Sequence, residues 1–203
     1  RLVADLVTVA GADRLLTIDL HAGQIQGFFN IPVDELTALP ILVQYLKDKN
    51  LDDLVVVAVD IGISKRARDV AERLNVPLAI AEKRRDGNSS NTQSLNIIGD
   101  VKNKTVLTFD DEIDTGGSML AAVDALRERG AKTAYACVTH AILSGPAAER
   151  LVRSPVEELV ATDTVPLDGK SVDGKITVLP VAPLLGEAIN RIHKGLSVGE
   201  LFR

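Results

Sequence analysis

The chain has no tryptophan, one cysteine and one methionine, and aromatic residues make up only 3% of its 203 residues. The single cysteine, Cys137, excludes an internal disulfide framework, and its place in the apolar run AYACVTHAI predicts a buried, unreactive thiol. Because large aromatic side chains are scarce, the core has to be built mainly from Val, Leu, Ile and Ala. A hydrophobic content of 46% is sufficient for such a core.

Long apolar runs and an excess of basic residues are also missing. A membrane-spanning helix needs about 20 consecutive apolar residues, and the sequence has no such run and no visible secretory signal. We therefore expect no membrane partner and a cytoplasmic location. The formal net charge of −5 argues against a nucleic-acid partner, because general nucleic-acid surfaces are basic.

The first residues predict that the sequence starts within a longer protein. It begins with Arg1 rather than Met, and Leu2, Leu6 and Val9 follow at helical spacing before Gly11, a plausible C-cap. We expect an N-terminally truncated fragment, and a processed N-terminus is the alternative.

Short apolar runs alternate with amphipathic stretches along the whole chain. This alternation predicts an α/β fold with a mostly parallel sheet flanked by helices and right-handed crossovers. The segment DGNSSNTQS, residues 86–94, is expected to be a flexible loop. We expect strands over residues 15–20, 54–60, 77–85, 106–109, 133–139, 156–166 and 175–183, and helices over residues 38–49, 64–74, 119–130, 144–152 and 184–194.

The most informative segment is TVLTFDDEIDTGGS, residues 105–118. A buried strand ends in two adjacent carboxylates, and a small polar turn then opens onto a helix. Ligands bind at the carboxyl ends of parallel strands, helix N-termini attract anions, and glycines let a phosphate approach closely. The alternative is a solvated acidic turn before an ordinary capped helix. We favour a site for a phosphorylated sugar, formed by Asp110, Asp111, Asp114, Thr115, Gly116, Gly117 and Ser118.

Two further polar residues follow predicted strands. His21 could contact a nucleotide phosphate or help to position a metal, and a structural histidine is the alternative. Asp60, followed by Gly62, could coordinate Mg²⁺ while the backbone lies against a diphosphate. The basic residues of the next helix, in SKRAR, fit a solvated helix face equally well.

A basic cluster of Lys83, Arg84 and Arg85 precedes the flexible loop. Such a cluster beside a mobile segment fits a lid, which would expel water on closing and bring positive charge to a developing negative charge. A charged strand end is the alternative.

Five segments, which together cover nearly the whole chain, resemble segments of one known family. They are RLVADLVTVAGADRLLTIDLHAGQIQGFFNIPVDEL, NVPLAIAEKRR, NIIGDVKNKTVLTFDDEIDTGGS, VTHAILSGPA and AINRIHKGLSVGELF. Together and in this order they resemble the ribose-phosphate diphosphokinases, also called phosphoribosyl pyrophosphate synthetases. DLHAGQIQGFF separates this family from nucleobase phosphoribosyltransferases, which share only the ribose-phosphate loop.

The resemblance implies a type I phosphoribosyltransferase-like fold and two such domains in the family. Residues 1–36 would be the end of the N-terminal domain, residues 37–183 the C-terminal domain, and residues 184–203 a C-terminal helix and tail that packs back on the N-terminal domain. It also implies a homo-oligomer of dimers that can assemble into hexamers.

The implied reaction moves the diphosphoryl group of ATP to the 1-hydroxyl of ribose 5-phosphate, with Mg²⁺ as the cofactor. The products are 5-phosphoribosyl 1-diphosphate, used in nucleotide biosynthesis, and AMP. A non-catalytic regulatory homologue of the synthetase and a nucleobase phosphoribosyltransferase are the alternatives.

The resemblance also implies roles for single residues. Asp114–Ser118 would hold the 5-phosphate, with Asp110 and Asp111 near the ribose hydroxyls. One departure is Ile63, which stands where the family has the second of two glycines. The remaining roles are catalytic for Lys83, Arg85 and His21, metal-binding for Asp60 and His21, and a regulatory phosphate site for Gln26, Asp34 and Ser197.

Overall fold

The computed structural model describes residues 1–85, 93–170, 172 and 174–202 of the chain. These residues form two compact units, each with a sheet of its own. The smaller unit consists of Arg1–Pro40 and Val181–Arg203, and the larger unit consists of Ile41–Pro180.

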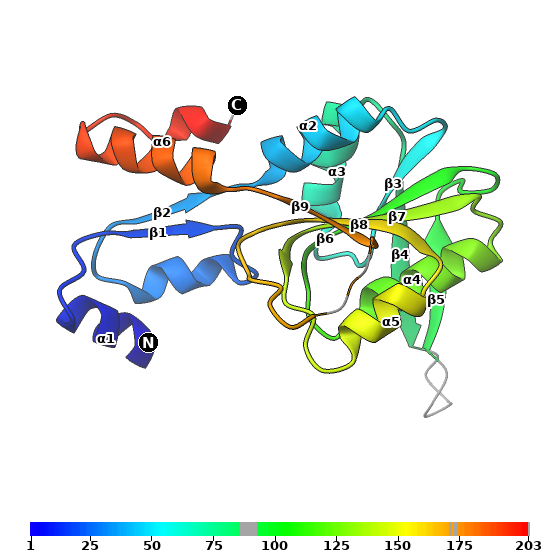
Figure 1. The fold of residues 1–203 in the computed structure, drawn as a ribbon, viewed down its shortest axis with the longest axis horizontal. Helices are drawn as coiled ribbons and strands as arrows, with labels where there is room; N and C mark the ends of the chain where they lie inside the picture. Colours follow the sequence, from blue (N-terminus) through cyan, green and yellow to red (C-terminus); the bar gives the residue numbers. More distant parts are fainter. Residues whose placement is uncertain (86–92, 171, 173, 203) are drawn as a thin grey trace. The chain divides into compact units, whose positions relative to one another are not determined.

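The larger unit is built on a seven-stranded sheet with the strand order β5-β4-β3-β6-β7-β8-β9. All neighbouring strands are parallel except β4 and β5, which are antiparallel. The strands are β3 (Leu54–Ala58), β4 (Leu78–Arg85), β5 (Gln93–Ile98), β6 (Thr105–Ile113), β7 (Thr133–Ala141), β8 (Val156–Thr162) and β9 (Ile176–Leu179). Helices α2 (Leu39–Lys49) and α3 (Ser64–Leu74) cover one face, and α4 (Gly117–Glu128) and α5 (Ala147–Arg153) cover the other (Figure 1). This mostly parallel sheet flanked by helices confirms the predicted fold class.

The core of the larger unit lies on both faces of its central strands. All five residues of β3 and the first five of β6 are buried. Such near-continuous apolar strands are typical of parallel sheets, because helices cover both faces. Leu46 of α2 and Leu126 of α4 are fully buried. Rigid central strands fix the positions of the loops at their carboxyl ends, where the candidate site lies.

Several predicted boundaries are wrong. Strand β6 continues to Ile113, so Asp110 and Asp111 lie within the strand rather than after it. It continues because β7 still pairs with it there, with Ile113 in register with Ala141. Helix α4 begins earlier than expected, at Gly117. Strand β5 was not predicted, and it includes the last two residues of the segment expected to be a loop.

The smaller unit contains a parallel strand pair, β1 (Leu15–Ile18) and β2 (Val33–Leu36). In Figure 1, α6 (Ala182–His193) lies on one side of this pair, and α1 (Leu2–Val9) and the 3-10 helix η1 (Gly23–Phe28) lie on the other. A second 3-10 helix, η2 (Gly199–Phe202), follows α6. The sequence patterns predict β1, α1 and α6 but not β2 or η1, which are short and lack a clear period.

Cys137 lies within β7 and is fully buried. Burial raises the pKa of its thiol, because the thiolate is disfavoured in an apolar environment. We expect the native chain to resist iodoacetamide at about pH 8, where an exposed thiol is partly ionised, and the urea-unfolded chain to react readily. Mass spectrometry of the alkylated protein measures both. Rapid labelling of the native chain would contradict a closed core around β7.

Candidate functional site

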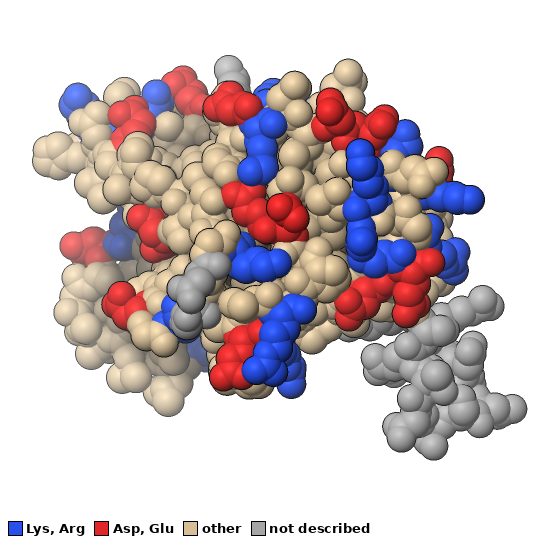
Figure 2. All heavy atoms as spheres, turned by 45° about the vertical axis from the view of Figure 1, so that its right-hand side comes forward, with Lys and Arg blue, Asp and Glu red and all other residues tan. Residues whose placement is uncertain are grey.

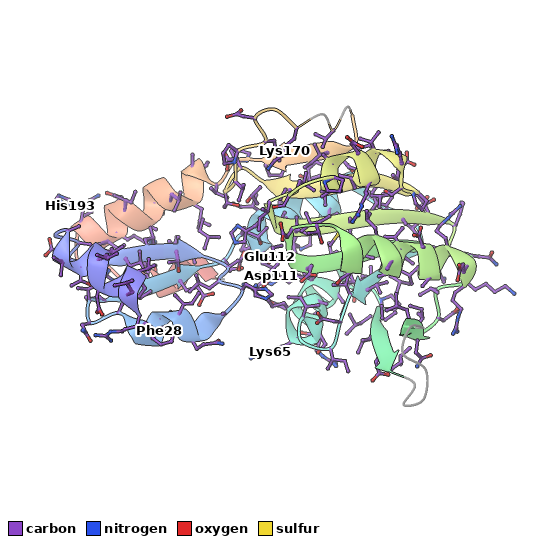
Figure 3. The ribbon with its side chains drawn as sticks, turned by 90° about the horizontal axis from the view of Figure 1, so that it is seen from below. Phe28, Lys65, Asp111, Glu112, Lys170 and His193 are labelled. Atoms are coloured by element: carbon purple, nitrogen blue, oxygen red, sulfur yellow. The ribbon has the colours of Figure 1, made fainter. Side chains whose placement is uncertain are left out.

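The ends of β3, β6 and β7 meet at one edge of the larger sheet. The strand register pairs Ala58 with Phe109 and Glu112 with His140, so the segments after these strands lie side by side. Figure 3 labels Asp111 and Glu112 at this edge. The carboxyl edge of an open α/β sheet is the usual ligand site of such folds.

The turn from β6 into α4 contains the predicted phosphate loop, residues 114–118. Four of its five residues are exposed, and Gly116 is buried. Gly116 O accepts the first bond of the helix, from Leu120 N at 3.0 Å. The first N–H groups of an α-helix have no partner within the helix, so the start of α4 can present them to an anion.

Gly116 has a backbone conformation that favours glycine. It is the N-cap of α4 with φ +76° and ψ −2°, in the left-handed region. A Cβ at this position would lie 3.3 Å from Leu120 Cδ1. At Gly117 a Cβ would meet only Thr115 Oγ1, at 3.7 Å, which is an ordinary contact. The two adjacent glycines therefore differ, and the loop conformation depends on the first.

Asp110 and Asp111 point to opposite faces of β6, because successive strand residues alternate. Asp111 is buried and Asp110 is half-buried. Burial raises the pKa of Asp110 to about 7. The hydrogen bond that its Oδ1 accepts from Asp111 N, at 2.9 Å, opposes this rise, whereas the nearby carboxylates of Asp111 and Asp60 add to it. A cation or hydroxyl donor beside Asp110 would therefore relieve an unfavourable charge.

Arg66 of α3 belongs to the same edge. Its Nη1 lies 3.9 Å from Asp111 Oδ2, and its side chain is partly buried. The neighbouring Lys65 and Arg68 are exposed. Of the two interpretations left open for SKRAR, the solvated face holds for Lys65 and Arg68, while Arg66 faces the acidic strand end.

The turn after β3 runs from Asp60 to the start of α3. Asp60 Oδ1 accepts a hydrogen bond from Ile63 N at 3.0 Å, and a Cβ at Gly62 would lie 3.1 Å from the same oxygen. Gly62 therefore allows the turn to close on the carboxylate. Ile63 has φ −84° and is buried. Its backbone does not need glycine, and its side chain is accommodated in the core.

The oxygen ligands at this edge suit Mg²⁺ in combination with ligand oxygens. Within the part of the chain that the structure describes, no three His, Cys, Asp or Glu side chains converge on a common metal position. Mg²⁺ in proteins is commonly held by one or two carboxylates together with substrate phosphates and water. The carboxylate of Asp60 makes the smallest contribution to the raised pKa of Asp110.

The predicted lid is only partly visible. Lys83 and Arg85 belong to β4, where they pair with Leu95 and Gln93 of β5. Their side chains, and residues 86–92, lie outside the described residues. The lid and the catalytic roles of these two residues stay predictions.

His21 belongs to the smaller unit, where it is exposed shortly after β1. The preceding Asp19 is buried, and its Oδ2 accepts a hydrogen bond from Ala38 N at 2.9 Å. This bond ties the end of β1 to the segment that leaves β2. The roles of His21 in catalysis and metal binding stay predictions.

The candidate regulatory residues also lie in the smaller unit, and each is hydrogen-bonded there. Gln26 Nε2 donates to Glu35 Oε2 at 2.5 Å, Arg14 Nη2 donates to Asp34 Oδ1 at 3.0 Å, and Gly199 N donates to Ser197 Oγ at 3.1 Å. A phosphate would meet two carboxylates in this group. The regulatory assignment stays a prediction.

Sequence reasoning missed the turn that follows β7. The N–H groups of Ile142 and Leu143 both donate to Ile113 O at 3.0 Å, and Ser144 N donates to Asp114 O at 3.0 Å. The turn thus holds the backbone at the start of the phosphate loop. The sequence predicts a helix from residue 144, whereas α5 begins only at Ala147. The sequence also does not show which carbonyl groups the turn reaches.

His140, at the end of β7, was also missed. Its Nδ1 lies 2.8 Å from Thr164 Oγ1, and Thr164 Oγ1 donates to Thr139 O at 3.2 Å. These contacts fix the imidazole next to Glu112 of β6 in the strand register. A histidine within an apolar strand pattern gives no sign of such neighbours.

The surface carries both signs of charge. On the face drawn in Figure 2, Lys and Arg side chains are interspersed with Asp and Glu. Interspersed charge does not create the strong single-sign field that steers polyanions. Among the described residues, no helix has both the length and the apolar content needed to cross a bilayer.

Comparison with known proteins gives consistent matches. A family model described as the phosphoribosyl synthetase-associated domain matches residues 85–203. The chain is 56% identical over 203 residues to a ribose-phosphate pyrophosphokinase of Caldanaerobacter subterraneus, and 52% identical over 202 residues to one of Oceanobacillus iheyensis. These alignments cover 100% of this chain but 64% and 63% of the relatives, so the chain spans slightly less than two thirds of their length.

Solved structures show the same relationship. The phosphoribosylpyrophosphate synthetase from Mycobacterium smegmatis matches with a TM-score of 0.87 and 42% identity, over 96% of this chain and 63% of that one. Orotate phosphoribosyltransferase from Aeropyrum pernix matches with a TM-score of 0.52 and 22% identity, over 75% of this chain and 74% of that one, which shows a shared fold alone. The predicted phosphoribosyltransferase-like fold is confirmed.

Proposed function

The chain belongs to the ribose-phosphate pyrophosphokinase family, and on that premise we propose that it forms the ribose 5-phosphate-binding part of an enzyme that makes 5-phosphoribosyl 1-diphosphate. This enzyme transfers the β,γ-diphosphoryl group of ATP to the 1-hydroxyl of ribose 5-phosphate and releases AMP. Such a transfer needs in-line positioning and charge neutralisation rather than a covalent intermediate.

The observation that carries the proposal is the phosphate loop directly after an acidic strand end. Gly116 in the left-handed region lets the start of α4 present N–H groups to the 5-phosphate. Asp110 and Asp111, a few residues before it, can accept hydrogen bonds from the ribose hydroxyls. The same segment thus supplies hydrogen-bond donors for the 5-phosphate and hydrogen-bond acceptors for the ribose hydroxyls.

Arg66 supports the acidic pair. Its Nη1 lies 3.9 Å from Asp111 Oδ2, so the two side chains form an ion pair at the end of the strand. The two oxygens of a carboxylate can accept hydroxyl hydrogen bonds. No cation forms an ion pair with Asp110 within the part of the chain that the structure describes, and the pKa of Asp110 is raised. A sugar hydroxyl or a cation would satisfy this carboxyl on binding.

Mg²⁺ fits this site as a partner of Asp60 and of bound phosphate oxygens. When bound, Mg²⁺ neutralises charge on the diphosphoryl group. Asp60 is exposed at the sheet edge, with one oxygen already oriented by Ile63 N at 3.0 Å. Lys83 and Arg85 would cover the diphosphoryl group, and His21 would act on the ATP side.

A full-length chimera tests the proposal. In it, this chain replaces the matching segment of the Caldanaerobacter enzyme, which supplies the rest of a family protein. With ATP, ribose 5-phosphate and Mg²⁺, we expect AMP and 5-phosphoribosyl 1-diphosphate to form in equal amounts, measured by chromatography. Lys83→Ala should lower kcat by about 100- to 1000-fold, as loss of one transition-state donor does elsewhere.

Lys104→Ala is the matched control for Lys83→Ala. Lys104 lies directly before β6, at the opposite edge of the sheet, and its Nζ lies 3.4 Å from Asp53 Oδ1 in a surface ion pair. Surface pairs contribute little, so kcat should stay within about twofold. Binding of ribose 5-phosphate without any turnover would instead indicate a non-catalytic regulatory homologue. Exchange of diphosphate for a nucleobase would indicate a nucleobase phosphoribosyltransferase.

A further inference from the structure

The turn after β7 holds an unusual backbone conformation. Leu143 has φ +50°, although it is not glycine, and its side chain is 2% exposed. A left-handed conformation costs a non-glycine residue about 1–2 kcal/mol and persists where its surroundings enforce it. The buried side chain and the bond from Leu143 N to Ile113 O, at 3.0 Å, are two such constraints.

Lys170 forms a second contact with the turn after β7. It lies on the connection between β8 and β9, its side chain is half-buried, and its Nζ donates to Ile142 O. Its own backbone N donates to Leu167 O at 3.0 Å, which anchors the connection locally. Figure 3 shows Lys170 at the same edge of the larger unit as Glu112. A charged donor makes this a stronger bond than a neutral one.

The Lys170 contact acts directly on the peptide that supports the phosphate loop. Ile142 O and Leu143 N–H belong to one planar trans peptide, so they point in opposite directions. A bond to Ile142 O therefore orients Leu143 N–H toward Ile113 O. Ser144 N, one residue on, reaches Asp114 O at 3.0 Å, and Asp114 is the first residue of the phosphate loop.

We propose that Lys170 is a positioning residue that sets the conformation of the phosphate loop through the turn 142–144. The inference rests on the proposed function, because it takes this loop to hold the 5-phosphate. Lys170 acts on the affinity for ribose 5-phosphate and not on the transfer step, since its Nζ contacts the turn rather than the loop. Loss of its charge leaves the Ile142 carbonyl unsupported and the loop free to move.

Lys175 provides a matched control. Its Nζ also donates to backbone carbonyls, those of Val156 and of Ser154, the latter at 3.4 Å, and its side chain is also half-buried. These carbonyls lie at the start of β8, at the opposite edge of the sheet from the phosphate loop. Lys175→Met therefore removes the same chemistry without touching the site.

The test compares the unsubstituted chain with Lys170→Met, Lys170→Arg and Lys175→Met. Amide hydrogen exchange of residues 113–118 is measured by mass spectrometry, and ribose 5-phosphate binding by calorimetry. We expect Lys170→Met to speed exchange there and to weaken binding about tenfold, equivalent to about 1.4 kcal/mol. Lys170→Arg keeps a charged donor and should stay within about threefold of the unsubstituted chain. Lys175→Met should change neither quantity.

Two results would overturn the proposal. One is unchanged exchange of residues 113–118 in Lys170→Met, and the other is an equal change in Lys175→Met, which would indicate general loosening. The exchange measurement needs no substrate, so it decides the role of Lys170 even if the unsubstituted chain fails to bind ribose 5-phosphate. That failure would count against the proposed function alone. In the chimera, Lys170→Met should raise the KM for ribose 5-phosphate and leave kcat within about twofold.

Discussion

Replacing Gly116 with alanine is expected to weaken ribose 5-phosphate binding by about 100-fold, or about 2.7 kcal/mol. The backbone at Gly116 has φ +76°, and a methyl group there would approach Leu120 Cδ1 to 3.3 Å. A left-handed alanine costs about 1–2 kcal/mol, and the loop can relieve this strain only by turning away from its observed conformation. The N–H groups at the start of α4 would then no longer converge on one phosphate. Calorimetric titration with ribose 5-phosphate measures the effect.

Gly117→Ala is the control for Gly116→Ala. A Cβ at Gly117 would lie 3.7 Å from Thr115 Oγ1, which is ordinary van der Waals contact, and the residue is already helical. Its substitution should leave binding within about threefold and stabilise the helix slightly, because alanine is the better helix former. Equal losses in both variants would mean that the loop needs two small residues for phosphate access rather than one left-handed position.

The phosphate loop could be predicted from the sequence because its features are local. The strand, acidic pair, turn and helix follow one another within residues 105–118, so each signal supports the next. The sequence could not distinguish the two glycines, because only the backbone angles show that Gly116 is left-handed. The alternation of strands and helices likewise predicted the parallel sheet, since each unit of that pattern is local.

The remaining contacts of the site join segments far apart in the chain. Arg66 meets Asp111 because α3 follows β3, the strand that pairs with β6, and the helical pattern of SKRAR gives no sign of which residue faces the end of β6. Lys170, which follows β8, bonds to Ile142, which follows β7. Strand β5 was missed for a related reason, because it exists as the antiparallel partner of β4 and its own sequence is short. Such pairings depend on tertiary structure, which overrides local preference.

Asp110→Asn is expected to stabilise the chain at about pH 8 by about 1–2 kcal/mol while impairing its activity. The pKa of Asp110 is raised from 3.8 to about 7, mainly by burial. A carboxyl with a higher pKa in the folded chain binds its proton more tightly there. Its contribution to the free energy of unfolding is therefore complete below 3.8 and is lost as the pH rises through about 7. The full shift corresponds to about 4 kcal/mol, which solvent around a half-buried group reduces.

Thermal unfolding between about pH 3 and pH 8, a range that spans both pKa values, measures this effect. The unsubstituted chain should lose stability across that range more steeply than Asp110→Asn, and the two should converge at the acid end, where both side chains are neutral. Asp52→Asn, at an exposed residue before β3, should keep the steeper profile.

Adding Mg²⁺ distinguishes two explanations for the expected effect of Asp110→Asn: a cation-binding role of the carboxylate, or its burial alone. If the carboxylates of Asp60 and Asp110 favour a cation, Mg²⁺ added at about pH 8, where Asp110 is ionised, should restore stability in the unsubstituted chain and much less in Asp110→Asn. The same substitution should lower kcat/KM in the chimera, because an amide cannot accept hydroxyl hydrogen bonds on both of its terminal atoms. Stabilisation by Mg²⁺ that is equal in both variants would place the ion elsewhere. Burial of a ligand-binding carboxylate is unfavourable until the ligand is bound. Replacing such a carboxylate with an amide is therefore expected to raise the stability of the free chain and to lower its activity.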